Sequence, residues 1–248
     1  MPKGFIVAID GTAGSGKSTT ARKAAEILGF FYLDTGAMYR AITWKIIKSK
    51  IDLCDSDSLK ELVAKTKIDF NKENKIRLDG KEVSEQIRRP AVDRMVSQVS
   101  VLPLVRKKMV VEQKRFAKNR NVICEGRDIG SVVFPHANLK LYLDCDLKER
   151  AKRRAKELKE KGIKVTAKEI KENFYERDYI DSTRAHSPLK KMPDAIYLDT
   201  TNLTIENEVK IVIDLIKAKF KIRKLTTKIP TPGVYRAKRD KQPKTIKK

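Results

Sequence analysis

Residues 5–18 read FIVAIDGTAGSGKS, and this stretch decides the fold. A six-residue apolar run (5–10) leads into residues 11–18, a complete match to the G-x-x-x-x-G-K-[ST] phosphate-binding loop. An amphipathic helical pattern over 18–28 follows, so the motif has the strand–loop–helix context that it requires. The alternative is a chance Gly/Ser turn before a helix. We interpret the stretch as a site for a nucleoside triphosphate.

Each part of this loop has a physical task. Glycines let consecutive backbone N–H groups turn inward around phosphate oxygens. The start of the following helix adds the positive end of its dipole. Lys17 is placed to reach the β- and γ-phosphates, and the Ser18 hydroxyl is placed to bind Mg²⁺.

Composition limits the class of protein. The chain has 248 residues, of which 40% are hydrophobic, enough for one large domain or one domain with inserts. No apolar run approaches the ~20 residues of a membrane span, and the N-terminal run is too short for a signal peptide. Three scattered cysteines without a CxxC pair indicate reduced thiols in a cytoplasmic protein. His136 and His186 are the only histidines, which argues against a metal site built from Cys and His and against histidine-based acid–base catalysis.

The net charge of +24 has two interpretations. One is a nucleic acid or other polyanionic partner; the other is a set of lysine-rich, solvated helix faces. Residues 226–248 contain eight Lys or Arg against one Asp, with three prolines and little apolar content. We expect one domain over 1–225, built around the phosphate-binding loop, and a poorly ordered basic tail over 226–248.

Five short apolar runs predict a parallel sheet covered by helices on both faces, an α/β fold. The runs are 5–10, 30–34, 121–126, 139–144 and 195–200. Ligands of such sheets lie beyond the carboxyl ends of the strands, so functional residues are expected after Asp34, Glu125 and Asp144. Residues 67–83 break the pattern and predict a small antiparallel insert, with a tight turn at Asp79-Gly80.

Helix boundaries are also predicted. A helix is expected over about 91–101, and a second helix follows Pro103 to about 118. Thr35 and Gly36 are expected to cap the helix after the second strand. Pairs spaced by three residues predict two further helix starts, at Asp146–Glu149 and at Thr166–Glu169.

Charged residues near the predicted strand ends are candidates for phosphate contacts. Arg40, in LDTGAMYR (33–40), is either a second phosphate site or an ordinary surface arginine. Arg127 and Asp128, in EGRDIGSVVFP (125–135), are suited to a phosphate and to a metal, base or sugar, unless they form a solvated pair. Two further groups have the spacing of residues on one helix face. Each is either a solvated, salt-bridged face or part of a closing lid. The groups are Arg150, Arg153 and Arg154, and Arg177, Asp181 and Arg184.

These motifs together resemble the bacterial-type cytidylate kinases. The resemblance rests on LDTGAMYR, on an insert that ends LDGKEVSEQIRRPAV, on EGRDIGSVVFP and on RDYIDSTRAHSPL, and it spans about residues 4–217. It implies a five-stranded parallel sheet in the order 2-3-1-4-5, a monophosphate-binding insert over about 50–98 and a lid over about 150–176. The implied reaction is ATP + (d)CMP → ADP + (d)CDP.

The resemblance also implies roles for individual residues. ATP and Mg²⁺ are assigned to the loop: Gly11, Thr12, Ala13, Gly14, Ser15, Gly16, Lys17, Ser18 and Thr19, with Ser18 on the metal. The substrate monophosphate is assigned to Thr35, Arg40, Ser97, Arg106, Arg127, Asp128, Arg177, Asp181 and Arg184. Within that set Arg40, Arg127 and Arg184 hold the phosphate, Ser97, Arg106 and Asp128 read cytosine, and Arg177 and Asp181 contact the sugar. Catalysis is assigned to Lys17, Arg127, Arg150, Arg154 and Arg184.

The chain departs from the family pattern at a few positions. Thr35 replaces a serine found in some members, and Glu125 stands where others have aspartate. His136 occupies a loop position that is often acidic, and the tail beyond about 225 has no family counterpart.

Two other functions remain open at the level of sequence. One is a kinase of the same fold acting on UMP or AMP. The other is a nucleic-acid-associated protein that uses the loop as a nucleotide sensor, with the tail binding RNA or DNA. Nucleic-acid contact is expected, if at all, only through the tail, and the chain is expected to be a monomer without membrane contact.

Overall fold

The computed structural model describes residues 4–71, 73–160, 162, 165–221 and 234–235. Its centre is a parallel sheet of five strands: β1 (Ile6–Gly11), β2 (Phe31–Asp34), β6 (Val122–Glu125), β7 (Leu139–Asp144) and β8 (Ile196–Asp199). They lie in the order β2-β6-β1-β7-β8. Numbered by their appearance in the chain, this is 2-3-1-4-5, so the expected α/β architecture is confirmed.

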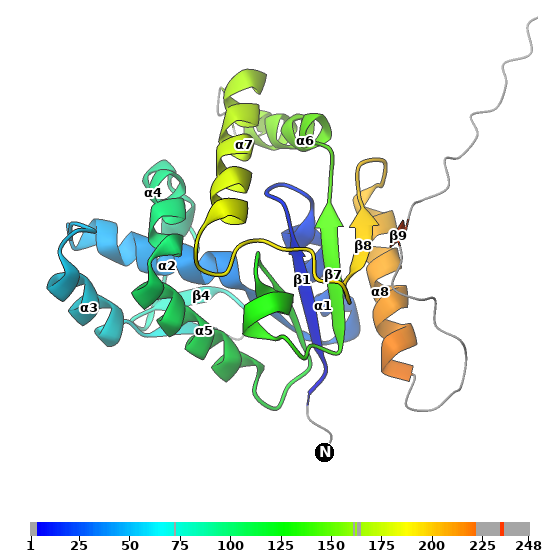
Figure 1. Cartoon of the computed structure of the whole chain (residues 1–248), viewed down its shortest axis with the longest axis horizontal. Coiled ribbons are helices and arrows are strands. Elements are labelled where there is room, and N and C mark those ends of the chain that lie inside the picture. Colours follow the sequence, from blue (N-terminus) through cyan, green and yellow to red (C-terminus); the bar gives the residue numbers. More distant parts are fainter. Residues whose placement is uncertain (1–3, 72, 161, 163–164, 222–233, 236–248) are drawn as a thin grey trace, which may run out of the picture.

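The sheet places the functional strand ends at one edge. β1 is central, with Ala8 opposite Cys124 of β6 and Ile9 opposite Leu141 of β7. Asp34 of β2 pairs in register with Glu125 of β6. In Figure 1 the carboxyl ends of the strands point toward the helices α6 and α7, which lie above them. The residues that directly follow each strand therefore lie together at the carboxyl edge of the sheet.

Helices cover both faces of the sheet. One face packs against α1 (Lys17–Leu28) and α8 (Ile205–Lys221), with Val7, Ile9 and Leu143 in the buried cluster. The other face packs against α2 (Thr35–Lys48), α4 (Pro90–Val101) and α5 (Pro103–Ala117). Because both faces are covered, the strands are apolar along nearly their whole length.

The expected antiparallel insert is present. It consists of β3 (Ile68–Phe70), β4 (Ile76–Leu78) and β5 (Lys81–Glu82), in that order, followed by a 3₁₀ turn, η1 (Gln86–Arg88). Asp79 and Gly80 both adopt positive φ, 48° and 84°, as the predicted tight turn requires. A helix before the insert, α3 (Ser56–Lys65), was not predicted from the sequence; the Asp55 carboxylate caps it by accepting the Ser58 N–H.

The predicted helix starts are partly right. Thr166 and Glu169 form the reciprocal capping box of α7 (Ala167–Thr183). Asp146 accepts N–H groups at the start of α6 (Leu147–Glu160), but Glu149 binds Lys152 and Arg153 and does not complete a box. The prediction for α2 was wrong: Thr35 opens that helix, and Asp34 is the cap because its carboxylate accepts the Ala37 N–H.

Helices α6 and α7 form the region predicted as a lid. They pack together and onto the phosphate loop through a small buried cluster of Ala13, Ala151, Ile170 and Phe174. Burying one aromatic side chain of this kind contributes about 1.5–3 kcal/mol. Arg184 lies one residue beyond α7, so it ends the helix rather than continuing its face.

Three further sequence expectations concern the rest of the chain. Cys124 and Cys145 are buried free thiols, as expected, and Cys54 is an exposed one. Within the described residues, no helix combines the length and the apolar character that crossing a membrane requires. The predicted disorder of 226–248 falls mostly outside the described residues; Val234–Tyr235 form a two-residue strand, β9, parallel to β8.

Candidate active site

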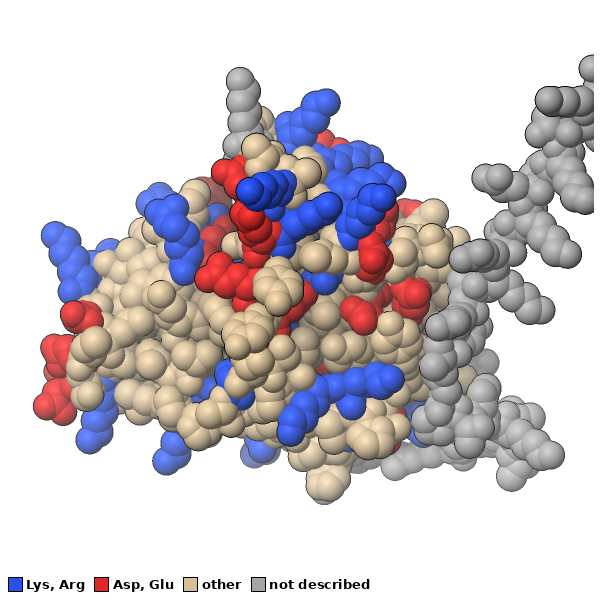
Figure 2. Space-filling view, turned by 45° about the horizontal axis from the view of Figure 1, so that its top comes forward, with Lys and Arg blue, Asp and Glu red and all other residues tan. Residues whose placement is uncertain are grey.

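One large cleft of about 1730 Å³ lies at the carboxyl edge of the sheet, between the phosphate loop, the insert and the α6–α7 region. The residues predicted to bind ATP and the monophosphate line this cleft, except Gly11, Thr12 and Ala13. Figure 2 shows basic side chains gathered at the top of the molecule, with acidic side chains beneath them. The residues that line this cleft come from many separate segments of the chain, the first at Gly14 and the last at Glu208.

Lys17 is the buried cation of the phosphate loop. It is 4% exposed, and its Nζ donates to the Thr12 carbonyl at 2.5 Å. Burial, with repulsion from Arg127, lowers the pKa of the Lys17 amine to about 7. An anionic phosphate beside this amine would stabilise its charged form and so raise the pKa again. The environment of Lys17 therefore favours binding of an anion.

Two loop glycines leave no room for a side chain. Gly16 has φ 92°, and a Cβ there would lie 2.6 Å from Glu208 Oε2. Gly14 has φ 75°, and a Cβ there would lie 2.7 Å from the Phe174 ring. The loop is consequently held between α8 on one side and α7 on the other, with its backbone free to face the cleft.

Ser18, at the end of the phosphate loop, and Glu125, at the end of β6, are in contact in the cleft. The Ser18 hydroxyl donates to Glu125 Oε1 at 2.7 Å, and the Tyr32 hydroxyl donates to the same oxygen at 3.3 Å. Burial and the nearby Asp34 raise the pKa of Glu125 to about 6. The part of the chain that the structure describes has no cluster of three or more His, Cys, Asp or Glu suited to a metal. Mg²⁺ needs only one or two protein ligands beside phosphates, so Ser18 and Glu125 fit it.

At the other end of the cleft, Asp128 is buried among arginines. Its carboxylate binds the Arg106 guanidinium, both side chains being about 5% exposed, and lies 3.7 Å from Arg184 Nη2. Burial raises the pKa of Asp128, while the two arginines oppose that shift. Arg184 Nη2 is buried and makes no hydrogen bond within the described residues, as is true of the Ser84 hydroxyl. This end of the cleft thus offers a carboxylate acceptor beside unused donors.

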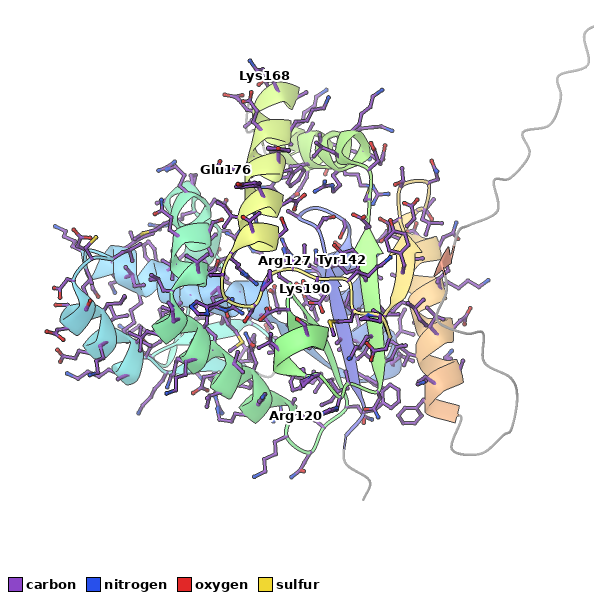
Figure 3. All side chains as sticks on the ribbon, in the orientation of Figure 1. Arg120, Arg127, Tyr142, Lys168, Glu176 and Lys190 are labelled. Carbon is purple, nitrogen blue, oxygen red and sulfur yellow. The ribbon has the colours of Figure 1, made fainter. Side chains whose placement is uncertain are left out.

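Between these two ends lies a group of cations. Arg127 Nε binds Asp181 Oδ2 at 2.7 Å, and Arg40 binds Asp93 at 2.6 Å. Figure 3 shows Arg127 between the lower end of α7 and the central strands. Arg177 makes no hydrogen bond or ion pair with the described residues. Burial and repulsion from Arg127 and Arg40 lower its pKa to about 10, and an anion bound near these guanidinium groups would offset that repulsion.

The three candidate lid arginines have different environments. Arg150 is buried, donates to the Ala13 carbonyl at 2.9 Å and binds Asp178, which itself accepts the Ala13 N–H at 2.9 Å. Arg153 Nη1 binds Glu208 at 3.1 Å and its Nη2 donates to the Thr200 carbonyl at 2.7 Å. Arg154 Nη1 binds Glu157 at 2.7 Å. Of these, Arg150 contacts the phosphate loop directly.

The remaining substrate candidates also line the cleft. Thr35 is buried, and its hydroxyl donates to the Glu125 carbonyl at 2.8 Å. Ser97 and Arg106 lie on either side of the α4–α5 bend at Pro103, and Arg106 Nη1 donates to the Ser100 carbonyl at 3.2 Å. The bend at Pro103 therefore brings both residues to one side of the cleft, as the sequence suggested.

Sequence reasoning missed several residues of the site. Asp178 and Phe174 hold α7 on the phosphate loop, and Glu208 accepts from the Thr20 hydroxyl at 2.8 Å behind it. Tyr32 and Ser84 were also not predicted. A weak sequence signal exists for one of them: Phe174 follows Ile170 by four residues, which places two apolar side chains on one helix face.

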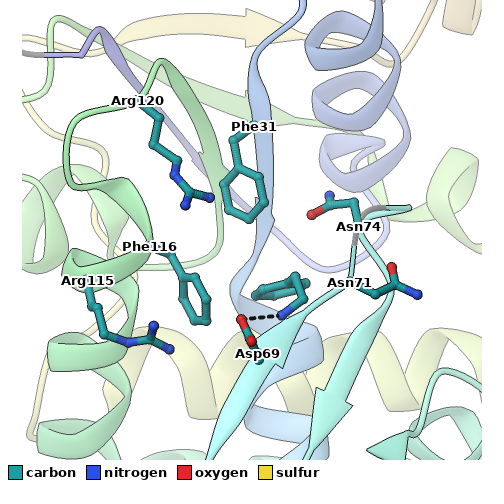
Figure 4. A pocket seen from close by; sticks show the side chains of 8 residues that line it. Phe31, Asp69, Asn71, Asn74, Arg115, Phe116 and Arg120 are labelled. Carbon is teal, nitrogen blue, oxygen red and sulfur yellow. Dashed lines mark hydrogen bonds between the residues drawn. The ribbon is translucent and has the colours of Figure 1, made fainter. Parts of the chain in front are cut away.

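A smaller cavity of about 280 Å³ lies beside the cleft (Figure 4). The rings of Phe31, Phe70 and Phe116 pack at its base, with centroids 5.0–6.3 Å apart. Arg115 stacks on Phe116 and donates to the Ile68 carbonyl at 3.0 Å. These contacts join β2 to the insert and to α5. We therefore interpret the cavity as a gap in the packing between these elements.

Comparison with known proteins agrees with this geometry. The family model described as cytidylate kinase matches residues 7–218. The chain belongs to the cytidylate kinase family. It is 47% identical over 211 residues to the cytidylate kinase of Caldanaerobacter subterraneus subsp. tengcongensis, covering 85% of this chain and 94% of that one. The Alkaliphilus oremlandii cytidylate kinase is likewise 47% identical over 211 residues, covering 85% and 97%. The resemblance stated from the motifs is confirmed.

Proposed function

We propose that this protein transfers the γ-phosphoryl group of ATP to CMP and dCMP, giving ADP and CDP or dCDP. One observation carries the proposal. A single cleft is lined by the phosphate loop and by the buried Asp128–Arg106 pair, together with Arg40, Arg127 and Arg177. Family membership supports this assignment.

The chemistry needs positioning and charge neutralisation. An oxygen of the acceptor phosphate attacks the γ-phosphorus, one P–O bond forms, and the bond to the β-phosphate oxygen breaks as ADP leaves. The attacking oxygen is already anionic, so no general base is required. Lys17 and Arg127, with Arg150, Arg154 and Arg184 as further candidates, neutralise the charge that spreads over the equatorial oxygens.

The acceptor is proposed to lie across the middle of the cleft. Arg40, Arg127 and Arg184 hold its phosphate, and Asp181 with Arg177 contacts the sugar. Arg177 has repulsive neighbours in Arg127 and Arg40, which suits it equally to the phosphate. Thr35 contributes from the start of α2, where it braces the Glu125 carbonyl.

Base choice follows from hydrogen-bond polarity. The exocyclic amino group of cytosine is a donor, and the Asp128 carboxylate is an acceptor held by Arg106 in the same pocket. Uracil presents a carbonyl oxygen at that position, so it would face a carboxylate without a proton between them. A polar site rejects such an analogue more strongly than an apolar pocket rejects a missing methylene. Ser97 is proposed to complete the pocket.

Mg²⁺ is proposed to bind at Ser18 and Glu125, where it would neutralise phosphate charge when bound. Before it binds, the Tyr32 and Ser18 hydroxyls both donate hydrogen bonds to Glu125 Oε1, which keeps that side chain oriented. Glutamate in place of the commoner aspartate is compatible with this arrangement because its oxygen already reaches Ser18.

The test is ADP release with CMP, dCMP, UMP, dUMP, AMP and GMP in parallel. We expect turnover led by CMP and dCMP and lost in Lys17→Ala. Turnover led by UMP or AMP would overturn the base-site assignment, and no turnover with any monophosphate would overturn the kinase assignment. The same preparation, analysed by light scattering, tests the proposed monomer.

A further inference from the structure

Asp10, the residue before the phosphate loop, is bound to the loop that carries Arg127 and Asp128. Its side chain is 5% exposed. Oδ1 accepts the Ile129 N–H at 2.8 Å, and Oδ2 accepts the Gly130 N–H at 2.7 Å. Asp10 does not line the cleft. It therefore acts on the cleft indirectly, and its hydrogen bonds to these two peptide groups link it to the loop that carries Arg127 and Asp128.

These two peptide groups begin η2 (Ile129–Val133), a π-helical turn whose N-cap is Asp128. The first N–H groups of a helix have no partner within it. Here Asp10 provides the missing acceptors from another strand. The other side of the loop is also tied to β1, since the Gly126 N–H donates to the Ile9 carbonyl at 3.0 Å. Arg127 and Asp128 are thus held from both sides by two consecutive residues of β1.

The fit around the carboxylate is close. A Cβ on Gly130 would lie 3.3 Å from Asp10 Oδ2 and 3.2 Å from Lys140 Cδ. Two carboxylate oxygens match two N–H donors. An asparagine offers one oxygen and sets its own NH₂ group against the second N–H, which loses one bond and leaves a buried donor unpaired.

We propose that Asp10 is a positioning residue for base recognition: through the Ile129 and Gly130 N–H groups it holds Asp128 and Arg127 in place relative to the phosphate loop. Base recognition and ATP binding thereby depend on one strand, with Asp10 bound to the loop that carries Asp128 and Gly11 opening the phosphate loop. This inference rests on the proposed function.

The test compares Asp10→Asn with wild type in steady-state kinetics. We expect KM for CMP to rise about tenfold to a hundredfold, because a hydrogen bond to a charged group is lost. The ratio of kcat/KM for CMP over UMP is expected to fall at least tenfold, with KM for ATP within about twofold. Unchanged KM for CMP and unchanged selectivity would overturn the proposal.

Asp144 provides the matched control. It ends the neighbouring strand β7, and its Oδ1 accepts the Thr12 hydroxyl at 3.0 Å and the Cys145 N–H at 2.9 Å. Asp144 therefore contacts the phosphate loop through Thr12, while its Oδ2 accepts the Tyr197 hydroxyl at 3.2 Å. Asp144→Asn is expected to raise KM for ATP more than KM for CMP. If both variants raise both KM values alike, Asp10 has only a general structural role and the proposal fails.

Two additions keep the outcome clear. If Asp10→Asn does not fold, Gly130→Ala pushes against the same contact while keeping the carboxylate, and it must also raise KM for CMP. Calorimetric binding of CMP is measured without turnover in wild type and variant. If wild type binds CMP but does not phosphorylate it, the proposed function fails, whereas the Asp10 inference is still decided by the loss or retention of CMP affinity in the variant.

Discussion

Replacing Asp128 with asparagine should relax the preference for CMP over UMP. The carboxylate is 5% exposed and is held by Arg106, so it keeps a fixed position. A hydrogen bond from the cytosine amino group to this charged acceptor is worth about 1.5–3 kcal/mol, or about a ten- to 150-fold change in kcat/KM. The asparagine NH₂ can instead donate to the uracil oxygen, so the CMP-to-UMP ratio should change by at least this factor.

The same substitution has a cost in stability. Asparagine keeps an oxygen for Arg106 but removes the counter-charge of that guanidinium, whereas Arg184 retains Asp181, whose Oδ1 lies 3.6 Å from its Nη1. Removing one partner of a buried ion pair costs up to about 3–5 kcal/mol, so the melting temperature should fall. Competition between CMP and UMP is therefore measured at a temperature where both proteins are folded. The control is Asp69→Asn, an exposed carboxylate that, among the described residues, accepts only the Phe70 N–H. If selectivity in Asp128→Asn equals that of wild type, the reasoning about the base site is refuted.

Three further predictions concern the strand ends and the loop. Lys17→Ala should lower kcat/KM at least about a hundredfold, the usual effect of removing one donor to a developing charge; a loss under tenfold would exclude Lys17 from catalysis. Gly16→Ala should lower the melting temperature and raise KM for ATP, since its Cβ would lie 2.6 Å from Glu208 Oε2; wild-type values for both would contradict the close fit. Burial raises the pKa of Asp10 to about 6 from 3.8, so the folded state holds a proton that the unfolded chain releases. As the pH rises from 4 to 6, the unfolding free energy of wild type should therefore fall by about 3 kcal/mol relative to that of Asp10→Asn. Denaturant titrations that give a constant difference between the two proteins over this range would contradict the shift.

Local sequence signals predicted much of the fold. The phosphate loop, the five strands, the Asp79-Gly80 turn and the Thr166–Glu169 capping box each depend on residues within a few positions of one another. The predictions were wrong where several neighbouring residues were equally suited to the same structural role. At the start of α2, Asp34, Thr35 and Gly36 are all suitable caps, and only the backbone geometry after β2 selects Asp34.

The site divides in the same way. Arg150, Arg153 and Arg154 are equivalent by helical spacing, yet Arg150 lies on the phosphate loop, Arg153 on α8 and Arg154 beside Glu157. Spacing along a helix determines which side chains share a face, but not which element packs against that face. Asp178 and Phe174 were missed for the same reason.

By itself, the sequence determined the chemical groups of the site: a phosphate-binding loop with its strand and helix, a set of arginines, and an order of motifs that resembles one kinase family. Those features are encoded in residue type and short spacing. The tertiary structure alone decided which charges face one another. Asp10 binds peptide groups 119 and 120 residues further along the chain, and Asp128 binds Arg106 across 22 residues. Such pairings depend on how strands and helices are packed in space, and no local pattern in the chain records that packing.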